Sequence, residues 1–263
     1  MNDIELLKEK LKIYPNLSLR YYSHIDSTNT EGLRLLENNK ALGNLLLLTE
    51  HQDAGRGRHH RTWINDPEDS LTFSLVITDI HGLKPQSIPL LSLAAAIAVV
   101  DAILTTTTIK PKVKWPNDVL INRKKVCGIL SEAVWEGDHL KGAVIGFGIN
   151  IGKNAVPPTA DLRYPASSIE QMTGIKPSHL ILIEEILRSF FHWLPALEEE
   201  TFHKRYQNDL AFIGESVNIF NEVGKKSSSG ICNGITTNGS LIIKTKENKP
   251  IICSAGEITI RPA

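Results

Sequence analysis

The chain has 263 residues, and its 29 Lys and Arg residues balance its 29 Asp and Glu residues, so the formal net charge is zero. Proteins that bind nucleic acid in bulk ordinarily carry a basic surplus, so this balance disfavours that class and leaves open only a local basic patch. The three cysteines, Cys127, Cys232 and Cys253, form no CxxC pair, which argues against a disulfide framework or a structural zinc site and fits a reducing cytoplasm.

The first part of the chain predicts alternating helices and strands. Its amino terminus is polar and acidic, unlike a signal peptide. Thr28-Asn29-Thr30-Glu31 reads as a capping box, which predicts a helix from about residue 29. The apolar run of residues 88–104 contains Pro89 and Asp101, so it predicts a buried core helix rather than a membrane span. Periodicity predicts helices at 5–13 and 29–37 and strands at 19–24, 44–51, 71–78, 112–115, 125–134 and 140–150.

In the second part of the chain the predicted elements change from helices to short strands. A helical pattern runs over residues 178–200 and on to 210, and short alternating strands follow from about Gly214. Turn residues such as Asn238-Gly239 separate strands predicted at 217–220, 230–235, 241–244, 250–253 and 257–260. The sequence therefore predicts an α+β domain over residues 1–211, with a mixed sheet flanked by helices, and a compact β-barrel domain over residues 212–263.

A loop rich in arginine and glycine is the first candidate for chemistry. It reads Gly55-Arg56-Gly57-Arg58 and continues to Arg61 and Trp63. Arginine suits carboxylate and phosphate, and glycine lets the backbone approach an anion and turn its N–H groups inward. An indole offers a face on which a nucleobase can stack. The loop is expected to close over an anionic, aromatic ligand such as a nucleotide, and a solvated basic turn is the alternative.

Residues 114–118, Lys-Trp-Pro-Asn-Asp, and residues 125–130 form a second candidate. Lys114 and Lys125 are compact charges suited to a phosphate or to a carboxylate under attack. Asn117 could read an adenine edge, and Asp118 could bind a metal or orient a lysine. Turn chemistry after Pro116 is the alternative explanation of the Asn-Asp pair.

Two further segments carry weaker signals. Residues 146–150, Gly-Phe-Gly-Ile-Asn, end a strand, but a loop rather than a helix follows, so a dinucleotide fingerprint is not expected. These glycines could instead leave room for a flat ligand, or form a bulge. Residues 26–29, Asp-Ser-Thr-Asn, start a helix, where one hydroxyl would cap it and others could bind a polar ligand. Neither HExxH, GxSxG nor a P-loop occurs, so bound zinc, a serine hydrolase and a P-loop enzyme are not expected.

Taken together and in this order, these segments resemble the biotin protein ligases, also called holocarboxylase synthetases. The match includes Gln52 and a closing Gly-Glu-Ile-Thr-Ile-Arg over residues 256–261, and it spans nearly the whole chain. The resemblance implies a class II synthetase-like catalytic domain and an SH3-like carboxyl-terminal barrel. It also implies two steps: biotin and ATP, with Mg²⁺, give biotinyl-5′-AMP and pyrophosphate, and a lysine of a biotin carboxyl carrier protein, such as the acetyl-CoA carboxylase subunit, then takes the biotin.

The same resemblance assigns residues by position, with Lys125 as the main electrostatic catalyst, Arg58 retaining the adenylate and Lys114 contacting nucleotide or metal-bound phosphate. It assigns no metal ligand. Adenine is expected at Trp63, Asn117 and Asn150. The biotin set is Ser27, Thr28, Asn29, Gln52, Gly55, Arg56, Gly57, Arg58, Lys125, Gly128, Leu130, Gly146 and Gly148. The nucleotide set is Arg56, Arg58, Arg61, Trp63, Lys114, Asn117, Asp118, Lys125 and Asn150.

Two departures from the family pattern bear on these expectations. His60 stands where the family loop has a glycine, which would cost strain if that position has a positive φ. About twenty residues precede the first predicted strand, too few for the DNA-binding domain of bifunctional members. We therefore expect a cytoplasmic, monofunctional ligase with no DNA or membrane partner, and an exposed sheet edge leaves a homodimer open.

Two other functions compete with this interpretation. A lipoate or octanoate ligase would share the fold, but its Arg-Arg-x-x-Gly-Gly-Gly type of motif is missing here. A biotin-responsive binding module without turnover is a candidate from a different class, and the retained Lys125 argues against it.

Overall fold

The computed structural model describes residues 3–58, 61–80, 83–157, 164–221, 225–254 and 258–263. The helices are α1 (Asp3–Leu11), α2 (Thr28–Glu37), α3 (Pro89–Thr107), α4 (Ile169–Thr173), α5 (His179–Trp193) and α6 (Glu200–Asp209), with single 3₁₀ turns η1 (Pro85–Ser87) and η2 (Leu194–Ala196). The strands are β1 (Leu17–Ile25), β2 (Asn44–Gln52), β3 (Ser70–Ile77), β4 (Lys112–Lys114), β5 (Asp118–Ile121), β6 (Lys124–Glu136), β7 (His139–Asn150), β8 (Ser216–Asn221), β9 (Lys226–Ile235), β10 (Leu241–Lys244), β11 (Pro250–Cys253) and β12 (Ile258–Pro262).

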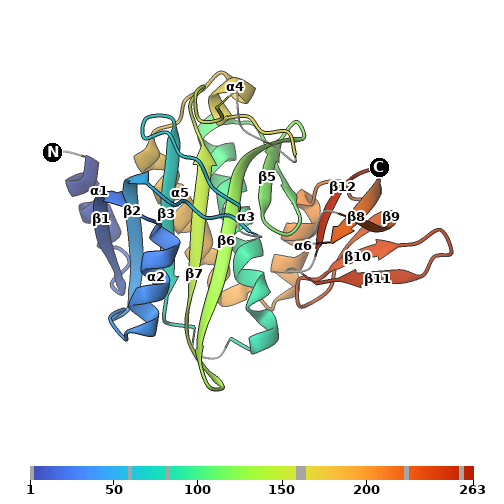
Figure 1. Cartoon of the computed structure of the whole chain (residues 1–263), viewed down its shortest axis with the longest axis horizontal. Coiled ribbons are helices and arrows are strands. Elements are labelled where there is room, and N and C mark those ends of the chain that lie inside the picture. The colour runs from blue at the N-terminus through green and yellow to red at the C-terminus, as the bar shows by residue number, and fades with distance from the viewer. Residues whose placement is uncertain (1–2, 59–60, 81–82, 158–163, 222–224, 255–257) are drawn as a thin grey trace.

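A seven-stranded sheet forms the larger part of the molecule (Figure 1), in the order β1-β2-β3-β7-β6-β5-β4. β1 and β2 run parallel, and every other neighbouring pair is antiparallel. The predicted mixed sheet flanked by helices is therefore confirmed. Strand β5 and the short helix α4 were not predicted, and the predicted helix over 178–200 breaks after α5 because Pro195 cannot continue the backbone hydrogen-bond ladder.

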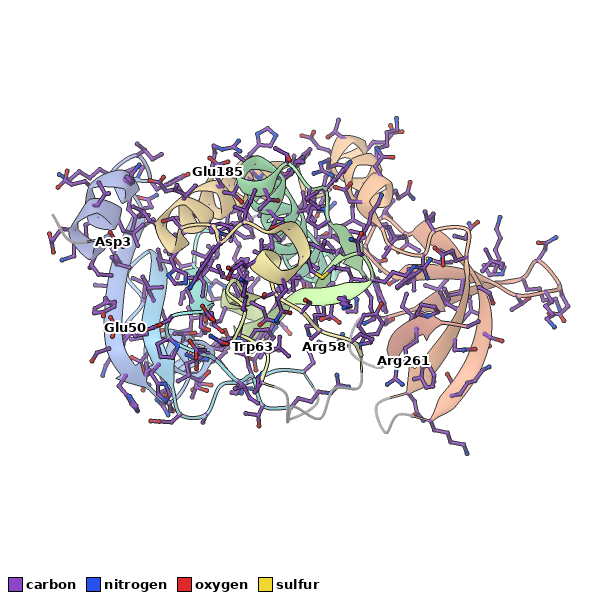
Figure 2. The ribbon with its side chains drawn as sticks, turned by 90° about the horizontal axis from the view of Figure 1, so that it is seen from above. Asp3, Glu50, Arg58, Trp63, Glu185 and Arg261 are labelled. Atoms are coloured by element: carbon purple, nitrogen blue, oxygen red, sulfur yellow. The ribbon has the colours of Figure 1, made fainter. Side chains whose placement is uncertain are left out.

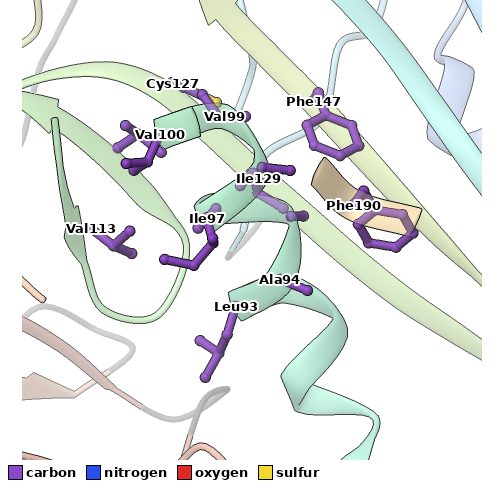
Figure 3. Close-up of a cluster of buried hydrophobic side chains, with 14 of the residues drawn as sticks. Leu93, Ala94, Ile97, Val99, Val100, Val113, Cys127, Ile129, Phe147 and Phe190 are labelled. Carbon is purple, nitrogen blue, oxygen red and sulfur yellow. The ribbon is translucent and has the colours of Figure 1, made fainter. Parts of the chain in front are cut away.

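Helix α3 is buried between the sheet and α5. Its side chains on every face pack into the main apolar core, against β6, β7 and Phe190 of α5 (Figure 3). A helix that is hydrophobic all round belongs in such an interior. By length and composition the helical stretch Pro85–Thr107, which contains α3, could cross a membrane, but 67% of its most apolar window is buried within this fold. The predicted core helix is confirmed.

Helix α2 covers part of the opposite face and packs on a smaller apolar cluster that includes Leu36, Leu47 and Val144. Ser27 is its N-cap, and the Ser27 hydroxyl accepts a hydrogen bond from the Thr30 amide. The capping-box prediction, which made Thr28 the cap, is therefore wrong by one residue. This shift leaves the Thr28 side chain free to enter the site described below.

The carboxyl-terminal strands form a separate five-stranded antiparallel sheet, in the order β11-β10-β9-β8-β12, as expected for an SH3-like unit. The buried Trp115 follows β4, and its indole Nε1 donates to the Gly239 carbonyl of this part at 2.9 Å. The Ala211 amide donates to the Val113 carbonyl at 2.8 Å. The first bond ties the turn between β9 and β10 to the segment after β4, and the second ties the chain that leads into β8 to β4 itself. Figure 1 shows the smaller sheet on the side of the molecule where β5 and α6 lie. The domain boundary between residues 211 and 212 stays a prediction.

Candidate functional site

Strand alternation decides which residues line the site. Successive side chains of a strand point to opposite faces of the sheet. Phe73 of β3 and Phe147 of β7 stack in the main core, with ring centroids 4.5 Å apart. Their even-numbered neighbours face the other side. These are Thr72 and Ser74 of β3, Gly146, Gly148 and Asn150 of β7, and Gly128, Leu130 and Glu132 of β6.

Strand register joins these positions into rows that cross the sheet. In one row, Gly146 of β7 lies between Leu130 of β6 and Ser74 of β3. A glycine in the middle of a row lets a planar group lie against the backbone. The principal row consists of successive Cα partners across five strands: Lys114, Asp118, Gly128, Gly148 and Thr72.

A shift in the pairing of β5 with β6 turns Lys125 toward this row. The shift leaves Val126 as an extra residue in β6. Such a bulge re-aims side chains, and bulges are common beside active sites. Val126 and Cys127 both lie in the apolar core, whereas Lys125 reaches the opposite face. A Cβ atom added to Gly128 would lie 2.8 Å from the Lys125 Nζ.

Two lysines share one carboxylate at the end of the row. The Asp118 Oδ1 lies 2.6 Å from the Lys125 Nζ, and its Oδ2 lies 3.0 Å from the Lys114 Nζ. Burial is the largest influence on Lys114 and lowers its pKa, although Asp118 opposes this. Burial alone would raise the pKa of Asp118, but the two ammonium groups hold it well below its usual range. The cluster has more cationic groups than anionic ones, which an anionic ligand could offset.

The arginine loop, which starts at Gly55 and ends at Trp63, folds back on itself over the principal row. The Gly57 amide donates to the Arg61 carbonyl, and the Trp63 amide donates to the Gly55 carbonyl, both at 2.8 Å. The Gly57 N–H is therefore engaged within the loop rather than turned toward an anion. The question raised by His60 lies outside the described residues.

The Trp63 indole lies directly on the glycines. A Cβ atom added to Gly148 would lie 2.2 Å from the Trp63 Cε2, and one added to Gly128 would lie 3.2 Å from its Cζ3. The Lys125 Nζ lies 5.7 Å from the indole ring centre. The Trp63 Nε1 is buried and has no hydrogen-bond partner among the described residues. The missing side chains at Gly128 and Gly148 thus make room for this indole.

This packing can be tested by substitution. We expect Gly148→Ala to lower the free energy of unfolding by about 1–3 kcal/mol, because the added methyl group overlaps the indole. Adding Trp63→Ala should recover most of that loss. Gly146→Ala is the matched control on the same strand, because its methyl group would meet the Asn29 side chain at 2.0 Å instead. Urea denaturation of the single and double variants measures the coupling between residues 148 and 63. If Gly148→Ala lowers the free energy of unfolding equally in the presence and in the absence of Trp63, the arrangement is contradicted.

Hydrogen bonds tie the start of α2 to the strands below it. The Gln52 Oε1 accepts from the Thr28 amide at 2.8 Å. The Ser74 hydroxyl lies 2.7 Å from both the Thr28 hydroxyl and the Asn29 Oδ1. The Asn29 Nδ2 donates to the Leu130 carbonyl at 3.0 Å. These buried side chains form one rigid wall, and rigid walls position ligands well.

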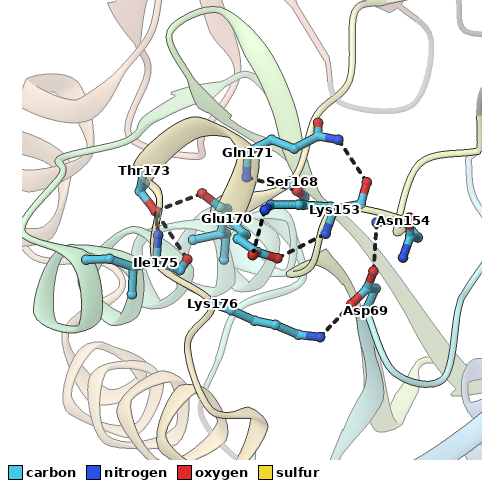
Figure 4. Close-up of polar contacts among 10 residues, drawn as sticks. Asp69, Lys153, Asn154, Ser168, Glu170, Gln171, Thr173, Ile175 and Lys176 are labelled. Carbon is cyan, nitrogen blue, oxygen red and sulfur yellow. Dashed lines mark hydrogen bonds and ion pairs between the residues drawn. The ribbon is translucent and has the colours of Figure 1, made fainter.

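The segment after β7 is fastened to the sheet by polar contacts around Asp69 (Figure 4). The Asp69 carboxylate accepts a hydrogen bond from the Asn154 amide at 2.7 Å and another from the Lys176 Nζ at 2.6 Å. The backbone of Lys125 pairs with residues 165–167, and the Asn150 Nδ2 donates to the Ser167 carbonyl at 3.0 Å. The backbone that carries Lys125 is therefore held from both sides.

These elements enclose a cavity of about 470 Å³. Every residue of the predicted biotin and nucleotide sets lines it except Gly55, which lines an adjoining hollow. Figure 2 shows Trp63, Arg58 and Arg261 on the same side of the molecule, and all three line the cavity. The ligand each residue contacts stays a prediction.

Several site residues were missed from the sequence. Thr72 lines the cavity and Ser74 supports its wall, and the period-two pattern of their strand could have revealed both. Glu132 pairs with Arg56 at 2.7 Å and accepts from Asn29, although no local motif marks it. Tyr164 lies under the Lys114 Nζ, which is 5.0 Å from the ring centre, and only the fold brings the two together.

Comparisons with the sequences of known proteins identify the family of this chain. Residues 21–150 match the model of the biotin/lipoate A/B protein ligase family. The biotin–[acetyl-CoA-carboxylase] ligase of Paracoccus denitrificans is 31% identical over 243 residues, which cover 88% of this chain and 95% of that protein. The chain belongs to the biotin/lipoate A/B protein ligase family.

Other relatives of this ligase agree with that assignment. The bifunctional ligase/repressor BirA of Bacillus spizizenii is 30% identical over 247 residues, covering 89% of this chain and 72% of that protein. The solved biotin protein ligase from Aquifex aeolicus, in complex with biotin and ATP, is 27% identical with a TM-score of 0.76. That likeness covers 94% of this chain and 99% of the solved one. The predicted resemblance to biotin protein ligases is confirmed.

Proposed function

We propose that this ligase activates biotin with ATP to form biotinyl-5′-AMP and then transfers biotin to a lysine of a biotin carboxyl carrier domain. Family membership supports the ligase chemistry, and relatives named as biotin–[acetyl-CoA-carboxylase] ligases support the substrates. The observation that carries the proposal is the cluster of Lys114, Lys125 and Asp118 at the end of a glycine-floored cavity.

The chemistry explains why positive charge is needed there. A biotin carboxylate must approach the α-phosphate of ATP, and two anions repel each other strongly at bonding distance. Ammonium groups aimed at the developing charge stabilise the transition state, and holding the two substrates together replaces a bimolecular encounter. Lys125 is the group we assign to this position. Lys114 sits deeper, tied to Asp118, so we assign it a supporting role with the nucleotide phosphates.

The two ends of the cavity suit the two substrates. Thr28 and Gln52 line the cavity and carry hydroxyl and amide groups suited to the polar ureido ring of biotin, and the Ser74 hydroxyl supports Thr28 from behind. The Trp63 indole, whose Nε1 has no partner in the described part of the chain, and the Asn117 carboxamide are suited to adenine. We infer that biotin takes the α2 end and the nucleotide the lysine end.

Mg²⁺ would enter as part of the nucleotide substrate. Asp118 is the one carboxylate among the described residues that line the 470 Å³ cavity, and each of its oxygens already binds an ammonium group. Mg²⁺ commonly keeps several waters and binds substrate phosphates. We therefore infer that ATP phosphates and water, rather than Asp118, supply most of its ligands.

One assay separates the candidate functions. The protein is incubated with ATP, Mg²⁺ and either biotin or lipoate, together with an apo carrier domain. We expect a biotinylated carrier and release of AMP and pyrophosphate. Transfer of lipoate instead of biotin would overturn the substrate assignment, and transfer of neither would favour a binding module without turnover.

Arg58 is expected to retain the adenylate. It lines the cavity, and its NH1 group donates to the Asn117 Oδ1 at 3.3 Å, which directs the guanidinium toward the nucleotide end. Arg58→Gly should therefore increase the dissociation rate of biotinyl-5′-AMP and label lysines on bystander proteins. Arg123→Gly, an exposed arginine paired with Glu215, is the control. An unchanged dissociation rate in Arg58→Gly would count against this role.

The remaining expectations stay predictions. The three cysteines of the chain, Cys127, Cys232 and Cys253, are all buried and free, which supports our proposal of a cytoplasmic protein. A homodimer and the absence of a DNA partner await measurements of mass and of DNA binding.

A further inference from the structure

Two histidines and an aspartate gather at the carboxyl ends of β1 and β2, outside the 470 Å³ cavity. His24 and His51 are Cα partners in the parallel pair, and their rings stack with centroids 4.7 Å apart. Asp53 follows β2 directly. Its Oδ2 lies 2.7 Å from the His24 Nε2, and its Oδ1 lies 3.6 Å from the His51 Nε2. The sequence did not predict this cluster, because strand pairing rather than chain spacing joins the two histidines.

These three groups match the ligand preferences of a transition metal ion. One ligand atom from each residue lies within 4.8 Å of the others. Ligands about 2 Å from a shared ion stand up to about 4 Å apart, so small side-chain rotations would complete the geometry. The side chains are 58%, 41% and 58% exposed for His24, His51 and Asp53, which leaves them room to rotate. Two imidazoles with one carboxylate suit Zn²⁺ and its neighbours, whereas Mg²⁺ prefers oxygen ligands alone.

The backbone already holds the ligands in place. Parallel neighbouring strands stand about 4.8 Å apart, which fixes the distance between the two histidine positions. The Asp53 amide donates to the Ile25 carbonyl at 3.0 Å, and the Ala54 amide donates to the Asp26 carbonyl at 2.8 Å. A metal ion would therefore need no change of fold.

We propose that His24, His51 and Asp53 form a binding site for a divalent transition metal ion of the Zn²⁺ type, with its remaining coordination positions taken by water. Because Asp53 begins the segment that leads into Gly55 and the arginine loop, the ion would fasten the base of that loop to β1. The site uses none of the residues assigned to biotin or ATP. A negative metal-binding result would therefore overturn this proposal and leave the proposed ligase activity untouched.

Metal binding to the whole chain tests this proposal without any substrate. Metal-free protein is titrated with Zn²⁺ by calorimetry and with Co²⁺ by visible absorption, and excess Mg²⁺ is present throughout. We expect one saturable site and a Co²⁺ spectrum typical of nitrogen ligation. His24→Ala and His51→Ala should each weaken Zn²⁺ binding by about 10-fold or more, since losing even an outer partner of a ligand costs that much.

His139→Ala is the matched control, since His139 is an exposed histidine at the start of β7, remote in sequence from the cluster. Circular dichroism confirms that each variant is folded. Unchanged Zn²⁺ affinity in His24→Ala and His51→Ala would place the ion elsewhere and overturn the proposal. No saturable binding to the unaltered protein would also overturn it, and would leave only an imidazole–carboxylate hydrogen bond between His24 and Asp53.

Discussion

Lys125→Ala is expected to slow formation of biotinyl-5′-AMP by ~10²-fold or more, the size typical of losing one donor to a developing negative charge. Lys125 is the more accessible of the two lysines, with a side chain 25% exposed against 5% for Lys114. The measurement is pyrophosphate release with biotin and ATP and no carrier. Transfer from preformed biotinyl-5′-AMP should fall less, because the two anions are already joined.

Two comparisons make this result specific. Lys124→Ala removes an exposed neighbouring lysine from the same strand and should leave the rate near that of the unaltered enzyme. In Lys125→Ala the carboxylate of Asp118 keeps its 3.0 Å pair with Lys114, so the variant should fold. A loss of only severalfold in Lys125→Ala would move the electrostatic role to Lys114.

Asp118→Ala is expected to lower the free energy of unfolding by about 3–5 kcal/mol, because it leaves the buried ammonium group of Lys114 without its partner. Adding Lys114→Met should recover part of the loss, since the unpaired charge is then removed. Glu215→Ala breaks the exposed pair with Arg123 and is the control, with an expected loss of about 0–1 kcal/mol. Urea denaturation measures all four proteins. A loss in Asp118→Ala no larger than the control would contradict the arrangement.

The same carboxyl group gives this stability a pH dependence. The folded-state pKa of Asp118 is held well below its usual value near 3.8. Its stabilising contribution is therefore complete above about pH 4 and is lost as the pH falls toward the depressed value. Stability of the unaltered protein relative to Asp118→Asn should stay constant from pH 7 to about pH 5 and shrink below pH 4. A difference that grows on acidification would have the wrong sign.

Much of the fold follows from local patterns in the sequence. Alternating side chains and turn residues such as Asn238-Gly239 predicted most of the strands, because pleating and turn geometry depend on near neighbours. The alanine-rich segment that became α3 was recognisable as core because it is apolar on every face. Strand β5 was not predicted, because it follows turn residues at Pro116 and its four residues are too few to show a periodic pattern.

The candidate site was partly visible for the same reason. Arginine, glycine and lysine clusters carry chemical preferences that do not depend on the rest of the chain. Their grouping into one cavity rests on register, which aligns Asp118 with Gly128 and Gly148 across three strands. Sequence spacing does not contain that information, because partners in a sheet come from distant segments.

The sequence by itself determined the residue types that could bind anions, most of the helical and strand segments, and the resemblance to biotin protein ligases. Tertiary structure alone decided three points. A bulge at Val126 turned Lys125 from the core side to the site, because one extra residue reverses the facing of a strand. The fold also laid Trp63 on Gly148 and brought His24 beside His51, because these contacts depend on where the backbone goes and not on how far apart the residues lie along it.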